Sequence, residues 1–543
     1  MICSSSIQKS LRALQVWLVL LAAPGYCAGL IVNPWVVTDR SVSCYDYPSL
    51  IADLTRGLET PQDKAIAVFR FFRRAMFPYT NRNEYPFPVN DQQHMFDFVR
   101  MVNVYGYALC TQTNWMFASV LKQSGQVEDA RGISVPGHGT AEVKWDGRWH
   151  FMDAIVGCYA FRRDRREIAS IEDILADSTL LSRAVAEGRA SQPFCPWDGK
   201  PIYPEEALAV TDQWYTYRKY GLDFLLKVIP DYKPAEADEP STFSMAFNLR
   251  PGFRLTRMWD NLPGMYNLSY EYYRNNKTIQ TPSPSILPPH HPDNGGERLD
   301  SLNFPLIEPY RKVILGRGSY HYYANGVLSY SDDFSDRRFM QAADSISSLI
   351  VEPGNAGRGG ILRCAPGDSL GEANLNFEAP YVFVGGSIRG RAEVVEGSWA
   401  AVYLDIGRTE NWLCLGVATS GGDFNFPIPA NLIEERYAFK IKLKLFDKSA
   451  AGSVRLYELK AEAVCQLNMY SLPFLAPGNN KVSVQAGAIP QGAALQVIYR
   501  WLERGRERTD LRLVSTPGES YTIAVSGIEY PRMKDISMEY IPR

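Results

Sequence analysis

The fold is decided by three stretches of the sequence: Gly106-Tyr107-Ala108-Leu109-Cys110, Gly137-His138-Gly139-Thr140-Ala141-Glu142-Val143 and Gly147-Arg148-Trp149-His150-Phe151-Met152-Asp153. Apolar residues after Cys110 recur at helical spacing, and Gly125 is a helix stop, which predicts a helix between these two residues. The chain that follows predicts strands over residues 129–135, 140–145 and 148–153. Asp146-Gly147 is a two-residue turn signal, so the last two strands are expected to form a hairpin.

A further helix is predicted upstream of Cys110. Thr60 is a good helix cap, Pro61 suits the first helical position, and Asp63 places a negative charge in the first turn. One apolar stripe follows at Ile66, Phe69, Phe72 and Met76. Helices and strands together predict an α+β block from about residue 45 to residue 188.

The helix start and the hairpin bring together residue types that suit thiol chemistry. A cysteine is nucleophilic as its thiolate, and a helix N-terminus, where Cys110 is expected, lowers the pKa of a thiol. His138 opens the hairpin, and an imidazole beside a thiolate forms an ion pair and later protonates a leaving amine. The turn places Asp153 within about one pleat of His138, where a carboxylate orients the ring. Cys110, His138 and Asp153 are therefore the predicted catalytic triad.

The three quoted stretches, with Gly125 and Arg131 between them, resemble the transglutaminase-like superfamily. The resemblance covers roughly residues 45–190, and the order Cys, His, Asp matches that family. It implies a papain-type fold in which Cys110 attacks an amide carbonyl to form a thioester, His138 acts as general base and acid, and Asp153 orients the ring. Water or an amine then resolves the thioester. This chemistry requires no metal or other cofactor, although some members of the family use calcium.

Two positions depart from the pattern of that family. Members usually carry a glycine two residues before the cysteine, where this chain has Ala108, and often an aromatic residue two positions after the histidine, where it has Thr140. The first departure leaves the second oxyanion donor, beside the Cys110 amide, unassigned. Three candidates for that donor are Asn103, Tyr107 and Gln112. The second departure is expected to open the site or to remove a wall of the substrate groove.

Length, composition and charge limit the number of domains and the classes of partner that the chain can have. At 543 residues, with 46% hydrophobic and 21% charged residues, it is an ordinary globular protein of about two to four domains. A formal net charge of −2 and the lack of a dense Lys/Arg run argue against nucleic acid as a partner. Lys9 and Arg12 precede an apolar run from Leu14 to Ala23, and small residues follow, which predicts a signal peptide and therefore a secreted, periplasmic or cell-envelope protein.

Cleavage near Gly29 leaves an odd number of cysteines: Cys44, Cys110, Cys158, Cys195, Cys364, Cys414 and Cys465. They show no Cys-x-x-Cys spacing, so no metal site is expected. An odd number in an exported chain leaves at least one thiol free or paired between molecules.

Beyond Leu306 the pattern changes to short strands with Gly, Asn and Asp turns, which predicts an antiparallel β-sandwich. The strands are expected at residues 379–384, 399–405, 412–418, 437–445, 454–463, 495–501 and 521–525. Prolines between residues 278 and 296 predict an extended linker, in which His290-His291 are solvated. The predicted fold class is α+β, with a signal peptide over 1–29, a transglutaminase-like domain of papain type over 30–235, an irregular aromatic segment and Pro-rich linker over 236–300, the β-sandwich over 301–480 and a β-rich segment over 481–543.

Other residues have two interpretations each. Trp399, Tyr403 and Trp412 either bind cell-wall or extracellular glycan or pack the sandwich interior, which is the commoner use of such residues. His150 is expected to be structural. Asn267 and Asn276 begin glycosylation sequons, which matter only in a eukaryotic secretory pathway.

These observations predict an exported thiol acyl-transfer enzyme that acts on a protein or peptide substrate, most simply by hydrolysing an amide bond. A cross-linking transglutaminase is the first alternative. The second is a non-catalytic surface protein that binds peptide or glycan, in which Cys110 is a buried small residue, His138 a turn residue and Asp153 a cap. Chemistry on carbohydrate by the same fold is a third.

Overall fold

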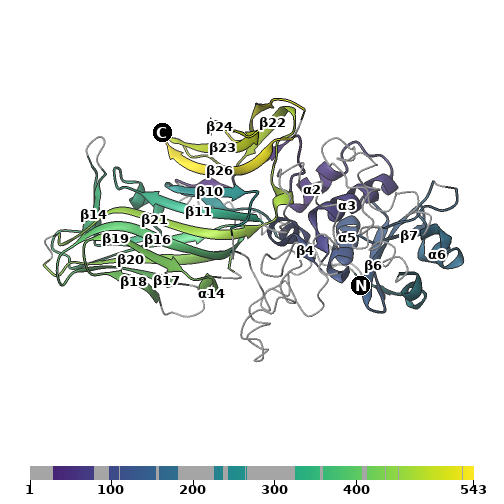
Figure 1. The fold of residues 1–543 in the computed structure, drawn as a ribbon, viewed down its shortest axis with the longest axis horizontal. Helices are drawn as coiled ribbons and strands as arrows, with labels where there is room; N and C mark the ends of the chain where they lie inside the picture. The colour runs from purple at the N-terminus through teal and green to yellow at the C-terminus, as the bar shows by residue number, and fades with distance from the viewer. Residues whose placement is uncertain are drawn as a thin grey trace, which may run out of the picture.

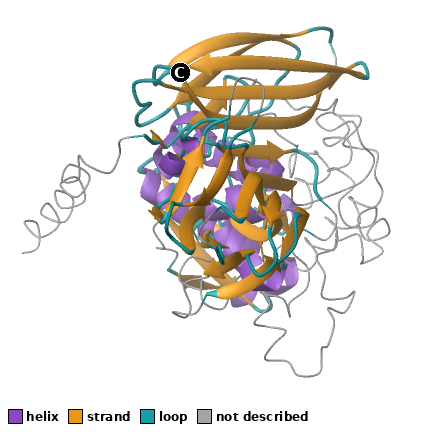
Figure 2. Cartoon of the chain, turned by 90° about the vertical axis from the view of Figure 1, so that its left-hand side faces the viewer, coloured by secondary structure: helices purple, strands orange, loops and turns teal. Residues whose placement is uncertain are grey.

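The computed structural model describes residues 29–78, 97–108, 110–154, 158–164, 166–181, 225–236, 243–262, 265, 324–354, 359–405, 412–433, 436–449, 452–528 and 530–543. The predicted signal peptide up to residue 28, the Pro-rich linker with its two histidines, Cys195 and both sequons lie outside these residues. The described chain forms one lobe that holds most of the helices and one lobe of long strands (Figure 1). Viewed along the long axis, the helices gather in one group behind the strands of the second lobe (Figure 2).

The helical lobe surrounds a small antiparallel sheet. Its helices are α2 (Tyr47–Leu54), α3 (Pro61–Ala75), α4 (Phe98–Arg100), the π-helix η2 (Met101–Tyr105), α5 (Cys110–Ser124), α6 (Ile171–Ala176) and the 3-10 helix η4 (Ile229–Asp231). The sheet has the order β7-β6-β5-β8, formed by β5 (Asp129–Val135), β6 (His138–Trp145), β7 (Arg148–Met152) and β8 (Lys233–Ala235). Two short strands, β3 (Phe77–Pro78) and β4 (Tyr107–Ala108), pair in parallel. Within the described residues, no helix has the length and apolar character needed to cross a membrane.

Both predicted helices are confirmed. The Thr60 hydroxyl caps α3 by accepting a hydrogen bond from the Asp63 backbone N–H at 3.1 Å. The buried stripe of α3 faces α5, where the Phe72 ring meets Phe117 edge-on at 5.7 Å. Helix α5 ends before Gly125, whose φ of +64° is the left-handed conformation that glycine adopts readily.

The predicted hairpin is confirmed as well. Asp146 and Gly147 have φ values of +49° and +73°, as a two-residue type I′ turn requires. Strand β6 begins at His138, two residues earlier than predicted, and β7 ends one residue before Asp153. Helix α5 lies close on this sheet, because a Cβ on Gly132 of β5 would come within 2.6 Å of the Trp115 indole nitrogen.

The second lobe is built from two large antiparallel sheets. The ten-stranded sheet contains β10 (Phe253–Met258), β11 (Ala324–Asp332), β13 (Leu349–Glu352), β14 (Ile361–Cys364), β16 (Val382–Val394), β19 (Gly422–Ile428), β21 (Val454–Leu467), β23 (Ala493–Glu503), β24 (Arg506–Val514) and β26 (Arg532–Pro542). Its order is β13-β14-β21-β11-β10-β26-β23-β24. Strand β21 also pairs with β16, and β16 pairs in turn with β19. The five-stranded sheet has the order β12-β15-β20-β17-β18, formed by β12 (Ser345–Ser347), β15 (Leu370–Glu378), β17 (Trp399–Asp405), β18 (Leu413–Ala418) and β20 (Ala438–Phe446).

Smaller elements complete this lobe. A three-stranded sheet contains β2 (Trp35–Thr38), β22 (Gly478–Gln485) and β25 (Glu519–Val525), and β1 (Ile31–Val32) pairs with β9 (Asn248–Leu249). The short helices are α13 (Arg338–Ala342), α14 (Ala430–Ile433) and the 3-10 helix η6 (Met469–Ser471).

Aromatic side chains join the two large sheets face to face. Phe383 of β16 meets Phe439 of β20 edge-on at 5.0 Å, and Phe253 of β10 lies 5.2 Å from Phe377 of β15. Burial of such rings is a large apolar contribution to the stability of a sandwich. The α+β class and the antiparallel strands predicted for the second half of the chain are confirmed.

Four strands of this lobe, β1, β2, β9 and β10, come from regions where the sequence predicted something else. Strand β10 lies inside residues 236–300, so the prediction of an irregular segment is wrong for Phe253–Met258. A buried Arg257 in place of an apolar residue hides its alternation. Strand β2 lies inside the predicted domain 30–235 but pairs with β22, from Trp35 opposite Gln485 to Thr38 opposite Val482.

The end of β21 joins the two lobes through Asn468. The Asn468 side-chain nitrogen donates to the carbonyls of Ala75 and Val102, both at 2.8 Å. Its backbone N–H donates to the Asn103 carbonyl at 2.8 Å. The strand lobe therefore holds the segment that leads into Cys110.

Candidate active site

Cys110 is the first residue of α5, where backbone N–H groups have no partner inside the helix. The residue is half-buried. Burial raises the pKa of its thiol, but the hydrogen bond with His138, the charge of His138 and the Gly139 backbone N–H together outweigh burial. The pKa of Cys110 is therefore below its ordinary value, which favours the thiolate.

His138 is the first residue of β6, directly after a turn at Gly137 with a φ of +74°. Its Nε2 lies 2.6 Å from Asp153 Oδ2, which leaves Nδ1 as the nitrogen that faces the thiol. Burial alone lowers the pKa of His138, but the charge of Asp153 and the hydrogen bonds with Asp153 and Cys110 raise it to about 10. The imidazolium form is therefore favoured at neutral pH.

Asp153 is fully buried and held on both sides. Its backbone N–H donates to the Cys158 carbonyl at 2.9 Å, and its own carbonyl accepts from the Cys158 N–H at 3.0 Å. One carboxylate oxygen binds His138, and the other accepts from Asn114 Nδ2 at 3.2 Å. The structure thus brings the three residues predicted from the sequence into one chain of contacts.

Asn114 is a member of this cluster that the sequence did not suggest. It lies four residues after Cys110, on the same face of α5, and its side chain is fully buried. Besides Asp153, its Nδ2 donates to the Gly139 carbonyl at 2.6 Å, and its Oδ1 accepts from the Ala154 N–H at 2.6 Å. One amide therefore ties the helix of the cysteine to the strands of the histidine and the aspartate. The i, i+4 spacing was the signal available for finding it.

Gly139 lets the histidine strand approach the cysteine helix. A Cβ at this position would lie 2.7 Å from the Thr111 hydroxyl oxygen and 2.8 Å from the Thr111 Cα. Backbone atoms cannot yield as a flexible side chain can, so only glycine fits here without moving β6. The glycine after His138 thus allows β6 to pack close to the start of α5, which keeps His138 near Cys110.

The three candidate oxyanion donors have different outcomes. Asn103 is excluded, because its Nδ2 is buried and donates to two backbone carbonyls at 2.7 and 2.8 Å. Gln112 is only 2% exposed and follows Cys110 by two residues, which is about 200° around a helix axis, so it faces away. The Tyr107 side chain lies outside the described residues. The Cys110 amide, in the first turn of α5, is the donor that the structure places at the thiol.

Two neighbouring residues are structural. Thr140 is fully buried, and the expected effect of its small side chain on the site or on a wall of the substrate groove stays a prediction. His150 stacks on Trp145 at 3.6 Å, and its Nδ1 lies 2.6 Å from the Ile168 carbonyl, as expected for a structural histidine. Burial lowers the pKa of His150, which favours the neutral ring.

The described residues include six cysteines, of which Cys44, Cys158, Cys364 and Cys465 are buried. Cys414 is exposed, and Cys110 is half-buried. The search of the described residues finds no group of three or more His, Cys, Asp or Glu side chains that could hold a metal ion.

The aromatic residues considered for glycan binding lie on the outer face of the five-stranded sheet. Trp399 and Tyr403 alternate along β17 with buried residues that face the other sheet, so the interior interpretation is wrong for both. Trp399 stacks on Phe446, Lys444 Nζ lies 5.5 Å from the Tyr403 ring, and Lys442 Nζ lies 4.1 Å from the Trp412 ring. Glycan binding by this face stays a prediction.

No protein-family model matches the sequence, and no curated protein matches it.

Proposed function

We propose that the protein is an exported thiol acyl-transfer enzyme that hydrolyses an amide or peptide bond. The chain of contacts from Cys110 through His138 to Asp153 carries this proposal. The thiol pKa is lowered and the imidazole pKa is raised to about 10, so a thiolate–imidazolium pair is favoured at neutral pH. Thiol acyl transfer starts from such a pair.

The proposed reaction has two halves, acylation of Cys110 and hydrolysis of the thioester that results. The Cys110 thiolate attacks the carbonyl carbon of the substrate, and the Cys110 backbone N–H stabilises the oxyanion that forms. His138 then gives its proton to the leaving amine as the C–N bond breaks, and a thioester remains. In the second half, neutral His138 takes a proton from water, the hydroxide attacks the thioester, and the acid leaves as the thiolate–imidazolium pair re-forms. Asp153 keeps the ring oriented throughout.

The same arrangement supports the resemblance to the transglutaminase-like superfamily and its papain-type fold. A cysteine at the start of α5 faces a hairpin that supplies the histidine and the aspartate, and α3 packs beside α5. The order of these elements is the one that the resemblance implies. We therefore propose residues 30–235 as the catalytic part of an exported chain and a protein or peptide as its substrate.

Alkylation of the folded protein tests the proposal, with Cys414 as an exposed reference thiol in the same molecule. Because the pKa of Cys110 is lowered, iodoacetamide is expected to label Cys110 faster than Cys414 below about pH 7, where an ordinary thiol is protonated. Labelling should decline only as the pH falls through the lowered pKa. Peptide mass spectrometry after timed labelling measures both rates. A Cys110 rate at or below that of Cys414 in the folded protein contradicts the proposal and favours a non-catalytic binding protein.

A second assay separates hydrolysis from cross-linking. The intact protein is incubated with a glutamine-containing protein and a labelled primary amine in water. Release of acid product without incorporated label supports the hydrolase, whereas label on glutamine identifies a transglutaminase. The Cys110→Ala variant serves as the control, because it removes the nucleophile from either reaction.

A further inference from the structure

Arg257 is a buried positive charge in the centre of the strand lobe. It lies on β10, and its side chain points to the same face as Leu255 because residues two apart share a face of a strand. Both side chains are almost fully buried, and Arg257 is 0% exposed. Arginine is one of the residue types that is almost never fully buried unless it is paired.

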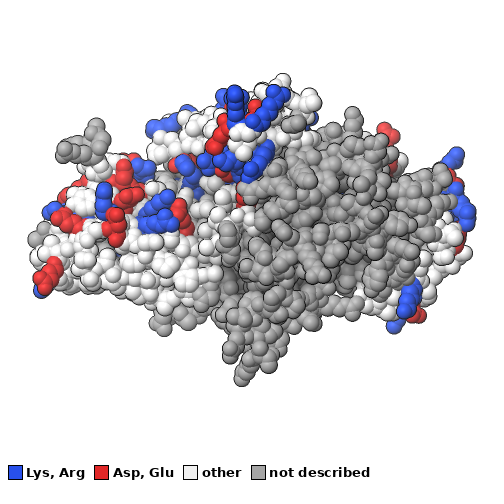
Figure 3. Space-filling model, in the orientation of Figure 1, with Lys and Arg blue, Asp and Glu red and all other residues white. Residues whose placement is uncertain are grey.

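Other arginines of this lobe have acidic partners. Arg254, on the opposite face of β10, binds Glu539, and Arg500 lies 2.8 Å from Asp535. Figure 3 shows Lys and Arg beside Asp and Glu over the strands of this lobe. None of the three guanidinium nitrogens of Arg257 has a hydrogen-bond partner of ordinary geometry within the described part of the chain.

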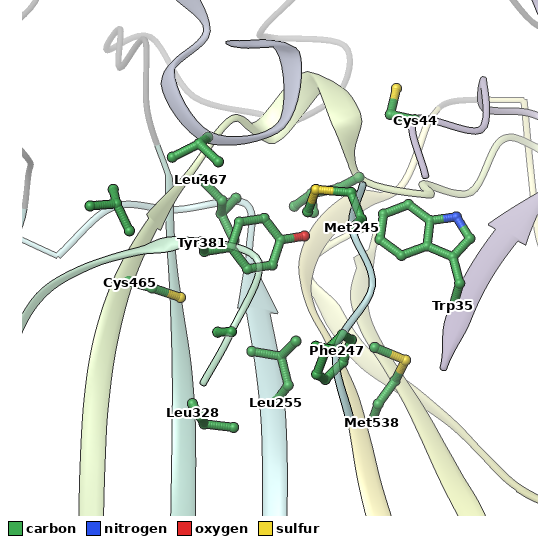
Figure 4. Packing of buried hydrophobic residues seen from close by; sticks show 14 of the residues in the cluster. Trp35, Cys44, Met245, Phe247, Leu255, Leu328, Tyr381, Cys465, Leu467 and Met538 are labelled. Carbon is green, nitrogen blue, oxygen red and sulfur yellow. The ribbon is translucent and has the colours of Figure 1, made fainter. Parts of the chain in front are cut away.

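The neighbours of Arg257 within the described part of the chain supply donors and no negative charge. The Trp35 ring lies 5.2 Å from the guanidinium carbon, and the indole nitrogens of Trp35 and Trp259 have no hydrogen-bond partner in the described residues. The Tyr381 hydroxyl contacts the Arg257 guanidinium, which acts to lower the pKa of Tyr381. In Figure 4 the Tyr381 hydroxyl points toward Met245, with Trp35 beyond it. All these groups can donate a hydrogen bond.

The three ionisable neighbours, Cys465, Tyr381 and Tyr499, are neutral at physiological pH, because burial raises the pKa of each. Burial raises the pKa of the Cys465 thiol to about 12, although the Arg257 charge acts in the other direction. Burial likewise raises the pKa of Tyr381 against the opposing influence of Arg257. Neither a thiolate nor a phenolate therefore compensates the guanidinium.

We propose that Arg257 and the donors around it form a binding site for a small monovalent inorganic anion, chloride in the first instance. Leaving a charge buried and uncompensated costs several kcal/mol, and the guanidinium does not deprotonate. A single negative charge matches a single positive one, whereas a divalent oxyanion leaves an excess charge in an apolar surrounding. The site holds Trp35 of β2 against β10 and does not depend on the proposed function.

Thermal unfolding of the full chain tests the site. Wild-type protein is measured in sodium chloride and in sodium gluconate at equal ionic strength, since gluconate is too large for a buried one-ion site. The midpoint is expected to rise by about 3 °C between 1 and 200 mM chloride and then to saturate. Arg257→Met, which keeps the length and removes the charge, should lose this rise, and Arg254→Met on the opposite face of β10 should keep it. Absence of the rise in wild type, or an equal rise in Arg257→Met, overturns the proposal.

A crystallographic measurement on wild-type protein keeps the test independent of whether the variant folds. Protein expressed, refolded and crystallised with bromide in place of chloride should show an anomalous bromine peak within about 4 Å of the guanidinium. A carboxylate from elsewhere in the chain at that position, water alone, or density without anomalous signal overturns the proposal.

Discussion

The two lobes each bury a charged side chain, and they treat it in opposite ways. In the helical lobe both oxygens of Asp153 are bound by side chains, one by His138 at 2.6 Å and one by Asn114 at 3.2 Å. In the strand lobe all three nitrogens of Arg257 lack a hydrogen bond of ordinary geometry within the described residues. The charged oxygens of the first cluster all have partners within the protein, whereas the second cluster contains hydrogen-bond donors without an acceptor of ordinary geometry.

This difference separates the proposed catalytic site around Asp153 from the proposed anion-binding site around Arg257. A buried polar network whose members are all satisfied is rigid and fixes geometry, which suits a triad that must keep a thiol and a ring in register. A buried charge without a partner is strongly destabilising, so a bound ion of opposite charge would stabilise the fold.

Asp153→Asn should break the complete cluster while changing little of its shape. Without the carboxylate charge the pKa of His138 falls from about 10 and less imidazolium forms. Loss of the imidazolium raises the pKa of the Cys110 thiol, and this outweighs the smaller direct effect of the Asp153 charge, which itself raises that pKa. Turnover is expected to drop by about 10³- to 10⁴-fold, and the pH midpoint of Cys110 alkylation should move upward. Asp129→Asn, on the surface of β5, is the control and should leave both quantities unchanged. An unshifted alkylation profile in Asp153→Asn removes the aspartate from the mechanism.

Asn114→Ala tests whether that cluster is held together by one amide. Its three hydrogen bonds are lost and the Gly139 carbonyl and Ala154 N–H are left buried, so unfolding should become easier by about 2–4 kcal/mol. Cys110 alkylation, measured well below the unfolding temperature, should slow about tenfold if the amide positions the pair. Asn376→Ala on the solvent face of β15 provides the matched control. A free energy of unfolding in urea within about 0.5 kcal/mol of the wild-type value would show that Asn114 does not hold the cluster together.

Local signals account for what could be predicted from the sequence. Thr60 to Asp63 fix the start of α3, and Asp146-Gly147 fix the hairpin turn, because both act within a few residues. Since the hairpin sets its own register, the proximity of Asp153 to His138 followed from counting residues. The contact of both with Cys110 rested on the family resemblance.

Two features could not be predicted because their causes lie far away or contradict the pattern. Strand β2 pairs with β22 across more than 440 residues, and no local signal in Trp35–Thr38 names that partner. Arg257 breaks the apolar alternation of β10 and made a central strand read as irregular chain. Asn114 was missed for a similar reason, since a buried amide on a helix interrupts the apolar stripe.

Gly139→Ala should enlarge the gap between the two halves of the active cluster. The added Cβ meets the Thr111 Cα at 2.8 Å, so β6 must move away from α5 and His138 moves with it. We expect a loss of stability of about 1–3 kcal/mol and a slower alkylation of Cys110. Gly421→Ala is the control, because its nearest neighbour lies 3.6 Å from the added Cβ. Wild-type labelling kinetics in Gly139→Ala would show that the close approach is not what sets the thiol–imidazole contact.

Asn468→Ala asks whether the lobes are coupled, and it should give the smallest effect. The variant removes the side-chain bonds to the carbonyls of Ala75 and Val102 but keeps the backbone bond to Asn103, so we expect a loss of about 1–2 kcal/mol. Because the held segment leads into Cys110, alkylation of the thiol should slow by about two- to fivefold. Asn479→Ala, an exposed asparagine of β22, is the control. If Cys110 reacts at the wild-type rate while stability falls, the strand lobe stabilises the helical lobe without setting the geometry of its thiol.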